Sequence, residues 1–440
     1  MAVTPSILLQ PKSSTIAPVK IAIIGAGFTG LTAALKLAER GHKVVIFEKE
    51  SLPGGLAQGF KGRGWQWPLE KHYHHLFVSD KESLKFAKRV GVRIEFKKPI
   101  TATFFKDSIY QIDNAASLLK FSKLDFIGRI RVGAVILFLK LNPFWKPLES
   151  VSAKNFLTKT MGRGAWRILW QPLFEKKFGR AANQVPTSWF WARIKKRSSR
   201  LGYPLGGFQF LADKAAKKIV KKGGEILYDT PILKIRKKGL VFEILTESKR
   251  YIFDKVICTL PTSTFLKIMK GLTPAYQKKL FALRGLGALN LLLELKQPFL
   301  PKSIYWLNVN EPEFPFLCIV EHTNFVARGK YSGGHLVYVG NYLPPSHQYF
   351  FKSTDQLVRK YLPYLKKVNH NFSKSWIKKA YLFKEPFTQP LITLNYSRRL
   401  PRIATPVVGL YLANIQQVYP WDRGTNYSIE LGNKVAELIR

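Results

Sequence analysis

Three of the eight histidines in the chain lie within four residues, at positions 72, 74 and 75, and Tyr73 stands between them. In an extended segment His72 and His74 share one face, whereas Tyr73 and His75 share the other. An imidazole titrates near neutral pH and can accept or donate a proton during a reaction. We therefore take His72, Tyr73, His74 and His75 as the candidate catalytic residues.

Two other interpretations of these histidines stay open at the level of sequence. The rings can be hydrogen-bonded parts of a pocket wall, or His72 and His74 can be metal ligands. A zinc site needs about three to four protein ligands, and no cysteine or acidic residue is spaced to complete such a shell. We expect no metal.

The elements that would position this chemistry begin with a β–α–β unit near the start of the chain. Residues 20–25 form a short, apolar, β-branched run that is typical of a buried parallel strand. Residues 31–40 have the periodicity of a helix, and residues 43–48 form a second apolar strand. This order predicts a Rossmann-type domain that binds a dinucleotide.

Three glycines between the first strand and the helix fit the same prediction. Gly25 permits a tight turn, Gly27 lets the backbone approach a pyrophosphate, and Gly30 allows the helix to pack closely on the strand. N–H groups at the start of the helix face the phosphates and are assisted by the helix dipole. The predicted contacts in this turn are Gly25, Ala26, Gly27, Phe28, Thr29 and Gly30.

An acid ends the second strand. Glu48 lies 18 residues beyond Gly30, where its carboxylate can accept hydrogen bonds from both ribose hydroxyls. An acid at this position argues against a 2′-phosphate and hence against NADP. We count Glu48 and the adjacent Lys49 among the predicted cofactor contacts.

The segment after this acid carries a glycine pair, Gly54 and Gly55, followed by Leu56. Here the chain resembles the flavin-containing amine oxidase / protoporphyrinogen oxidase-like superfamily, in its bacterial and archaeal branch, and more distantly UDP-galactopyranose mutase. The resemblance implies that the glycine pair passes beside the pyrophosphate of FAD. Many members have arginine directly after the pair, where this chain has Leu56.

Two later segments carry the same resemblance. Residues 223–232, after an expected helix over 210–222, resemble the returning strand of the family, and Ile232 takes the place of the residue whose backbone contacts the adenine. Residues 409–414 resemble the last buried strand, and a helix over 429–439 follows. The resemblance implies cofactor contacts at Asn414, Arg423, Gly424, Thr425 and Asn426.

The family also suggests how the flavin ring is held and used. The helix N-terminus near residue 425 would face the flavin pyrimidine, where N–H groups stabilise the negative charge of the reduced ring. The stretch from His72 to His75 would pass close to the isoalloxazine. No cysteine lies near the C-terminal flavin region, so FAD is expected to bind non-covalently.

The predicted fold class is α/β plus α+β, with a discontinuous Rossmann-type FAD-binding domain and an inserted substrate-binding domain. The FAD-binding domain is expected in three segments, residues 20–100, 208–262 and 400–440. The substrate-binding domain is expected in residues 101–207 and 263–399, helical over 115–200 and built of antiparallel strands over 285–395. Within the second insert, strands are expected at 289–295, 316–321 and 335–339. Residues 1–19 are expected to form a flexible tail.

The charge of the chain is strongly positive. Lysine and arginine number 71 and acidic residues 27, which gives a formal net charge of +44. Such a field favours anionic lipid, nucleic acid or phosphorylated substrates, although spread-out lysines can also form only a solvated face. We expect a small substrate, apolar or anionic, peripheral contact with an anionic membrane, and no specific nucleic-acid binding.

The two cysteines, Cys258 and Cys318, lie in apolar runs and are expected to be buried and unpaired. They fit a reducing compartment, and we expect the protein in the cytoplasm or peripherally at the membrane. The longest apolar run, residues 132–139, is shorter than the roughly 20 residues of a membrane span. It is interpreted as a buried helix, with a helix lying in the membrane surface as the alternative.

The middle of the chain is rich in aromatic and basic residues. The aromatic ones are expected to form the core of a helical domain, with a slot for a flat substrate as the alternative: Trp166, Trp170, Phe174, Phe178, Trp189, Phe190 and Trp191. The basic residues are interpreted as contacts for an anionic substrate or lipid phosphates: Lys176, Lys177, Arg180 and those in residues 193–200.

Together these observations predict an FAD-dependent oxidoreductase that takes a hydride from a C–N or C–C bond. No second glycine fingerprint for a nicotinamide domain is present, so oxygen, a quinone or a protein would reoxidise the flavin. Two alternatives are a flavin-dependent isomerase of the mutase type and a flavin-binding protein without activity.

Overall fold

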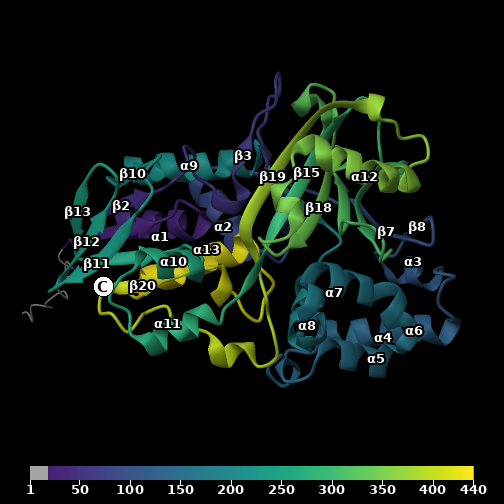
Figure 1. The fold of residues 1–440 in the computed structure, drawn as a ribbon, viewed down its shortest axis with the longest axis horizontal. Coiled ribbons are helices and arrows are strands. Elements are labelled where there is room, and N and C mark those ends of the chain that lie inside the picture. Colours follow the sequence, from purple (N-terminus) through teal and green to yellow (C-terminus); the bar gives the residue numbers. More distant parts are fainter. Residues whose placement is uncertain (1–17, 440) are drawn as a thin grey trace, which may run out of the picture.

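The computed structural model describes residues 18–439 (Figure 1). The predicted tail, residues 1–19, lies outside the described residues except for its last two. The chain forms three bodies: a parallel sheet with its helices, a large antiparallel sheet, and a group of helices at the lower right of Figure 1.

A five-stranded parallel sheet forms the first body, in the order β10-β2-β1-β14-β20. Its strands come from all three segments predicted for the FAD-binding domain, which confirms the predicted fold class. Their bounds are Lys20–Ile24 (β1), Lys43–Phe47 (β2), Glu225–Leu227 (β10), Lys255–Cys258 (β14) and Leu410–Leu412 (β20).

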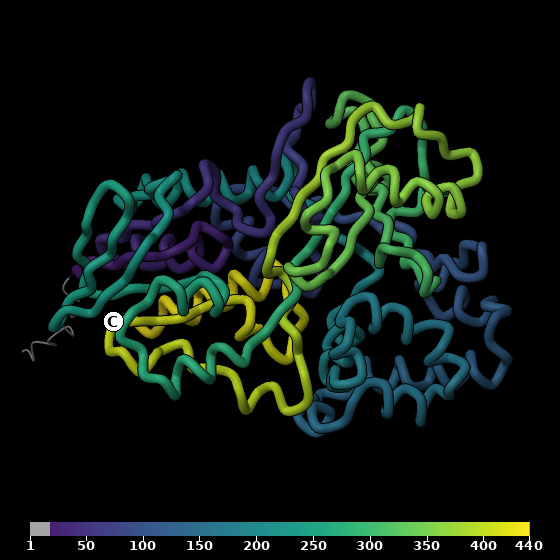
Figure 2. The backbone as a smooth tube through the Cα atoms, viewed as in Figure 1, coloured from purple at the N-terminus to yellow at the C-terminus, as the bar shows by residue number. Residues whose placement is uncertain are grey.

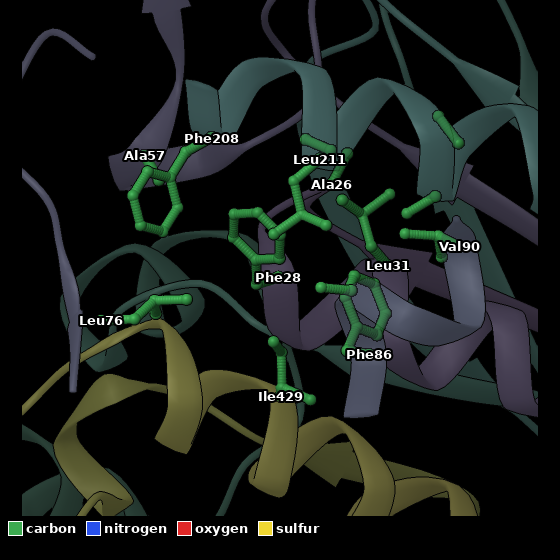
Figure 3. Packing of buried hydrophobic residues seen from close by; sticks show 14 of the residues in the cluster. Ala26, Phe28, Leu31, Ala57, Leu76, Phe86, Val90, Phe208, Leu211 and Ile429 are labelled. Carbon is green, nitrogen blue, oxygen red and sulfur yellow. The ribbon is translucent and has the colours of Figure 1, made fainter. Parts of the chain in front are cut away.

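Both faces of this sheet are covered, because successive apolar side chains of its strands point to opposite faces. In β1, Ile21 and Ile23 face one core, whereas Ala22 and Ile24 face another. The first core is covered by α1, α2, α9 and α13, whose side chains interdigitate in Figure 3. These helices span Phe28–Glu39, Lys81–Val90, Gly207–Lys221 and Thr425–Glu437.

The second core lies under a three-stranded antiparallel sheet and two helices. The strands are β11 (Lys234–Lys238), β12 (Val241–Leu245) and β13 (Arg250–Phe253), and the helices are α10 (Thr262–Ile268) and α11 (Pro274–Phe281). Residues 262–281, most of which the sequence assigned to the substrate domain, therefore pack on the parallel sheet.

Small strands extend the first body. A hairpin joins Gly59–Phe60 (β3) to Leu69–Glu70 (β4), and a second sheet has the order β5-β9-β6. In that sheet β9 (Leu201–Pro204) pairs with β5 (Leu76–Phe77) and β6 (Ile94–Lys97). The end of the first predicted insert is thus hydrogen-bonded to strands of the FAD-binding segment.

A seven-stranded sheet in the order β19-β15-β18-β17-β16-β7-β8 forms the second body. All neighbours are antiparallel except β16 and β7. The strands expected at 289–295, 316–321 and 335–339 correspond to β15, β17 and β18. The bounds are Ile100–Phe105 (β7), Ser108–Gln111 (β8), Gly285–Leu295 (β15), Ile304–Val309 (β16), Cys318–Glu321 (β17), His335–Leu343 (β18) and Ile377–Pro390 (β19).

The two faces of β15 have different partners. Leu289, Leu291 and Leu293 pack beneath α12 (Thr354–Val368), a helix the sequence interpretation did not anticipate. The alternate residues Ala288 and Leu292 join the core of the first body. This strand therefore turns Asn290 towards the first body as well, where it meets the predicted histidine cluster.

The third body consists of short helices, as predicted for residues 115–200, and its path is followed in Figure 2. The tryptophans and phenylalanines of this region are mostly buried in one cluster, which confirms the prediction of a helical core. The helices are Ala115–Leu119 (α3), Phe126–Leu141 (α4), Ala153–Met161 (α5), Arg163–Ala165 (α6), Gln171–Phe178 (α7) and Thr187–Lys196 (α8).

One expectation for this body was wrong. The apolar run 132–139 belongs to α4, but that helix is buried along one side alone. Val132 and Leu139 are buried in the helical core, and Val135 and Ile136 pack against it while partly buried. Among residues 18–439 no helix is long and apolar enough to cross a bilayer. Both cysteines are buried and free, as predicted.

The close packing of α1 on β1 gives the first testable prediction. Helix propensity alone would make Gly30→Ala stabilising by about 1 kcal/mol. A Cβ at Gly30, however, would lie 2.0 Å from the carbonyl oxygen of Gly25, so we expect Gly30→Ala to lower the free energy of unfolding by about 2 kcal/mol or more. Urea denaturation measures this change.

Gly164→Ala in α6 is the matched control, because a Cβ there would meet no other part of the described chain within 4 Å. Its free energy of unfolding should stay within about 1 kcal/mol of the wild type. Equal stability of the two variants would contradict the close approach of α1 to the turn.

Candidate active site

A cavity of about 1580 Å³ runs along the carboxyl edge of the parallel sheet. Residues at or just beyond the ends of four strands line it: Gly25 after β1, Glu48 after β2, Thr230 three residues beyond β10, and Thr259 after β14. Ligands of open parallel sheets bind at this edge, because the loops there diverge and leave a crevice.

Two glycine turns meet at backbone level in the wall of this cavity. The N–H of Gly54 donates to the carbonyl oxygen of Ala26 at 2.9 Å, and Gly27 and Gly54 form a parallel bridge. A Cβ on Gly55 would lie 3.0 Å from the Cα of Gly27. Side chains at this crossing would therefore separate the two turns and fill the space beside them.

The first turn of α1 opens on the same crossing. Within the described chain no side chain caps it, and Gly27, Phe28 and Thr29 line the cavity. The N-terminus of a helix attracts an anion through its free N–H groups and its dipole. The crossing and this helix start together fit a diphosphate.

Glu48 is held at the cavity by backbone groups. Its side chain is buried, and its carboxylate oxygens accept from the N–H groups of Ala26 at 2.7 Å and Glu50 at 3.0 Å. Each carboxylate oxygen can accept more than one hydrogen bond. The geometry thus leaves Glu48 able to bind ribose hydroxyls, the role the sequence predicts.

The C-terminal segment reaches the other part of the cavity. Arg423, Gly424 and Thr425 line it, and no described side chain caps α13 at Gly424. Arg423 donates from Nε to the Gln389 side chain at 2.9 Å and from Nη2 to the hydroxyl of Tyr342. A fixed cation and a helix N-terminus therefore face the same space.

Most predicted cofactor residues line this one cavity. Those in the lining are Gly25, Gly27, Phe28, Thr29, Glu48, Lys49, Gly54, Gly55, Leu56, Ile232, Arg423, Gly424 and Thr425. Ile232 stands in the loop after β10 rather than in a strand, because β10 ends at Leu227.

Four predicted cofactor residues lie behind the lining. Ala26 and Gly30 shape the turn. Asn414 donates to the carbonyl oxygen of Leu260 at 2.9 Å and accepts from the N–H of Gln416. The side chain of Asn426 accepts from the N–H of Ser83 at 3.1 Å. The Asn414 amide thus fixes the loop after β20, whereas Asn426 joins the first turn of α13 to α2.

The histidine cluster has the predicted alternation. His72 and His74 line the cavity. On the opposite face, the Tyr73 hydroxyl lies 3.3 Å from that of Tyr342, and Nδ1 of His75 lies 3.2 Å from the hydroxyl of Tyr305. The structure thus brings two of the four candidate catalytic residues to the cavity, whereas the other two anchor the segment.

Hydrogen bonds define neutral tautomers for both cavity histidines. The Asn290 amide donates to Nδ1 of His72 at 2.6 Å, which leaves the proton on Nε2. Nδ1–H of His74 donates to the carbonyl oxygen of His72 at 2.6 Å, which leaves Nε2 as an acceptor. The pair therefore offers one donor and one acceptor.

Burial keeps these rings uncharged. It is the main cause that lowers the pKa of His72 to about 3 and that of His74 to about 4, and nearby cations including Arg423 lower both further. At neutral pH the rings can orient a substrate or flavin by hydrogen bonds, but they are weak bases.

A half-buried carboxylate joins the C-terminal segment to the helical body. Asp422 pairs with Lys177 at 3.7 Å and Arg193 at 2.5 Å, and it accepts from Nε1 of Trp189 at 3.2 Å. These cations hold the pKa of Asp422 far below its usual range. Lys177 and Arg193, which the sequence analysis interpreted as contacts for an anionic substrate or lipid, are therefore paired with an acid of the protein itself.

Several lining residues were not predicted. Thr259 follows β14 directly, so the rule that ligands bind at the carboxyl ends of strands could have found it. Lys71 precedes His72 and bonds Gln58 across the cavity wall. Phe383 and Glu385 come from β19, where Pro386 and Pro390 obscure the strand pattern in the sequence.

The fold and the cavity fit a dinucleotide cofactor, and the family comparison identifies the class of protein. The family model described as "Flavin containing amine oxidoreductase" matches residues 28–416. The chain belongs to this family, which confirms the resemblance seen in its glycine motifs. A flavin is therefore its cofactor.

Curated relatives match over short segments. Hydroxysqualene dehydroxylase of Zymomonas mobilis is 32% identical over 82 residues, 19% of this chain and 20% of that protein. A 4,4′-diapophytoene desaturase of Staphylococcus haemolyticus is 49% identical over 49 residues, 11% of this chain and 10% of that protein. The matches thus span a fifth of these relatives or less.

Solved structures are similar over nearly the whole chain. An oxidoreductase from Methanosarcina mazei has a TM-score of 0.75 at 19% identity and covers 95% of this chain and 100% of its own. Reduced UDP-galactopyranose mutase has a TM-score of 0.75 at 16% identity, with 96% and 95% covered. At these identities the similarity shows the fold.

The neutral state of the cavity histidines gives a pH prediction. Between pH 6.5, where an unfolded histidine protonates, and the pKa of about 4 in the fold, His74 binds its proton only in the unfolded chain. Acid therefore favours unfolding through this residue. Below pH 6.5 the free energy of unfolding of the wild type should therefore fall, relative to that of His74→Gln, by about 1.4 kcal/mol per pH unit.

Urea denaturation at pH 7.5, 6 and 5 measures this shift. His370 is exposed, so His370→Gln should differ from wild type by the same amount at each pH. A pH-independent difference for His74→Gln would show that the ring is not held neutral.

Proposed function

We propose that the chain is an FAD-dependent oxidoreductase that takes a hydride from a C–N or C–C bond of its substrate, with FAD bound non-covalently. One observation carries the proposal. A single cavity joins the Gly27–Gly55 crossing and Glu48, which suit an ADP group, to His72, His74 and Arg423, which suit a flavin and substrate.

The ADP half would be held by backbone and one acid. The start of α1 and the glycine crossing would bind the pyrophosphate, Glu48 the ribose hydroxyls, and the backbone at Ile232 the adenine. The cavity-lining residues that the structure describes include no cysteine, which supports a non-covalent cofactor.

At the other part of the cavity, bound FAD would supply the ring that accepts the hydride. The chain would contribute binding and electrostatics. The N-terminus of α13 and Arg423 would stabilise negative charge, while Nε2–H of His72 and Nε2 of His74 would orient polar atoms of the ring or substrate. Leu382 and Phe383 give this region an apolar wall.

A non-redox isomerase of the mutase type is the second candidate. The fold similarity to UDP-galactopyranose mutase favours it, as does the number of basic side chains in the cavity lining: Lys49, Lys71, Lys267, Arg284, Lys352, Lys384 and Arg423. Such a lining suits an anionic substrate.

Anaerobic spectroscopy separates these two candidates. For the oxidoreductase we expect the oxidised flavin absorbance to bleach on addition of amine or polyene substrates without another reductant. Turnover that requires prior dithionite reduction and leaves the substrate's oxidation state unchanged would establish the isomerase instead.

The role of Glu48 gives a binding prediction. Hydrogen bonds to a charged group contribute about 1.5–3 kcal/mol, so Glu48→Gln should weaken FAD binding by roughly 10- to 100-fold. Titration of apoprotein with FAD, followed by quenching of flavin fluorescence, measures the dissociation constant.

Glu95→Gln is the matched control, because that side chain is 53% exposed on β6. It should bind FAD like the wild type, and circular dichroism should show both variants folded. Wild-type affinity in Glu48→Gln would rule out a ribose contact by this acid.

A further inference from the structure

Helix α4 exposes an apolar surface that the rest of the described chain, residues 18–439, leaves uncovered. Ile127 and Leu141 are 71% and 68% exposed, and Leu137 is 59% exposed. We call this the α4 surface, and it consists of Ile127, Ile130, Leu137, Phe138, Leu141 and, just beyond the helix, Phe144.

The exposed residues share one side of the helix. Ile127, Ile130, Leu137 and Leu141 recur at helical spacing, so they form a stripe along its length. The opposite side carries Val132 and Leu139, which are buried in the core with residues of α5 and α8. Two opposite sides of the helix are therefore apolar, although one side alone is needed for packing in the monomer.

The position of α4 makes this stripe accessible. The helical body forms a separate lobe in Figures 1 and 2, opposite the end of the molecule where the chain terminates. With 16 residues α4 is about 24 Å long, shorter than the roughly 30 Å hydrocarbon core of a bilayer. Because α4 is packed against the protein along one side, the side of the helix, and not its end, faces solvent.

The charge around the α4 surface is strongly one-sided. Residues 115–170 contain ten lysines and arginines against two acidic residues. Exposed basic residues stand on both sides of the helix in sequence: Lys120, Lys123, Lys146, Lys154, Lys159 and Arg163. An apolar stripe in such a cationic stretch of chain matches the layers of an anionic membrane surface, with acyl chains beneath phosphates.

We propose that the α4 surface is a membrane-docking site, with α4 lying in the plane of an anionic bilayer at the level of the headgroups. Charge complementarity selects this occupant over a second copy of the chain, because two copies with a net charge of +44 each would repel. The proposal does not depend on the proposed reaction, since the α4 surface is outside the cavity lining.

Flotation with lipid vesicles tests the proposal. The full chain should float with vesicles of phosphatidylcholine and phosphatidylglycerol at 70:30, and at least tenfold less with phosphatidylcholine alone. The double variant Leu137→Glu, Phe138→Glu should lose at least tenfold of its binding to the anionic vesicles. Both positions are more than half exposed, so the melting temperature should change little.

The control is Leu240→Glu, Val408→Glu, which adds the same two charges at positions 90% and 83% exposed in the first body. It should bind anionic vesicles within about twofold of the wild type. Wild-type protein that does not float, or equal binding by the two double variants, would overturn the proposal. The proposal would also be overturned if the wild type did not bind vesicles but formed a dimer in light scattering, and the α4 double variant were a monomer.

Discussion

The contact between two glycine turns is the constraint on which the site depends. Gly27 and Gly55 approach so closely that a Cβ on Gly55 would lie 3.0 Å from the Cα of Gly27. The hydrogen bond from Gly54 to Ala26 locks the turns together, and Ala26 in turn donates to Glu48. One backbone crossing thus sets the start of α1, the path of the glycine pair and the orientation of the acid.

The rest of the cavity is completed by segments from distant parts of the chain. Asp422 ties the C-terminal segment to the helical body through Lys177 and Arg193. Asn290 of the large sheet fixes the tautomer of His72. The three bodies are therefore coupled where flavin and substrate would meet.

Sequence predicted the parts of this structure that depend on local pattern. The β1–α1–β2 unit was predictable because its strands are continuously apolar and glycines stand where a backbone approach requires them. The exposure of α4 could not be predicted, because a helix with two apolar sides has the same sequence pattern whether it is buried or exposed. Asn414 was assigned to the cofactor, yet its amide caps a turn, and only the fold reveals which partner such a group finds. Phe383 and Glu385 reach the cavity through a proline-containing strand whose pattern gives no period.

The central claim is that three segments of chain form one non-covalent FAD site. Its most direct test is to heat-denature the purified protein, remove the polypeptide, and determine the mass and amount of released flavin. The account predicts FAD at about one molecule per chain. A flavin that stays attached to the denatured polypeptide, release of FMN, or a colourless protein that takes up no added FAD would contradict it.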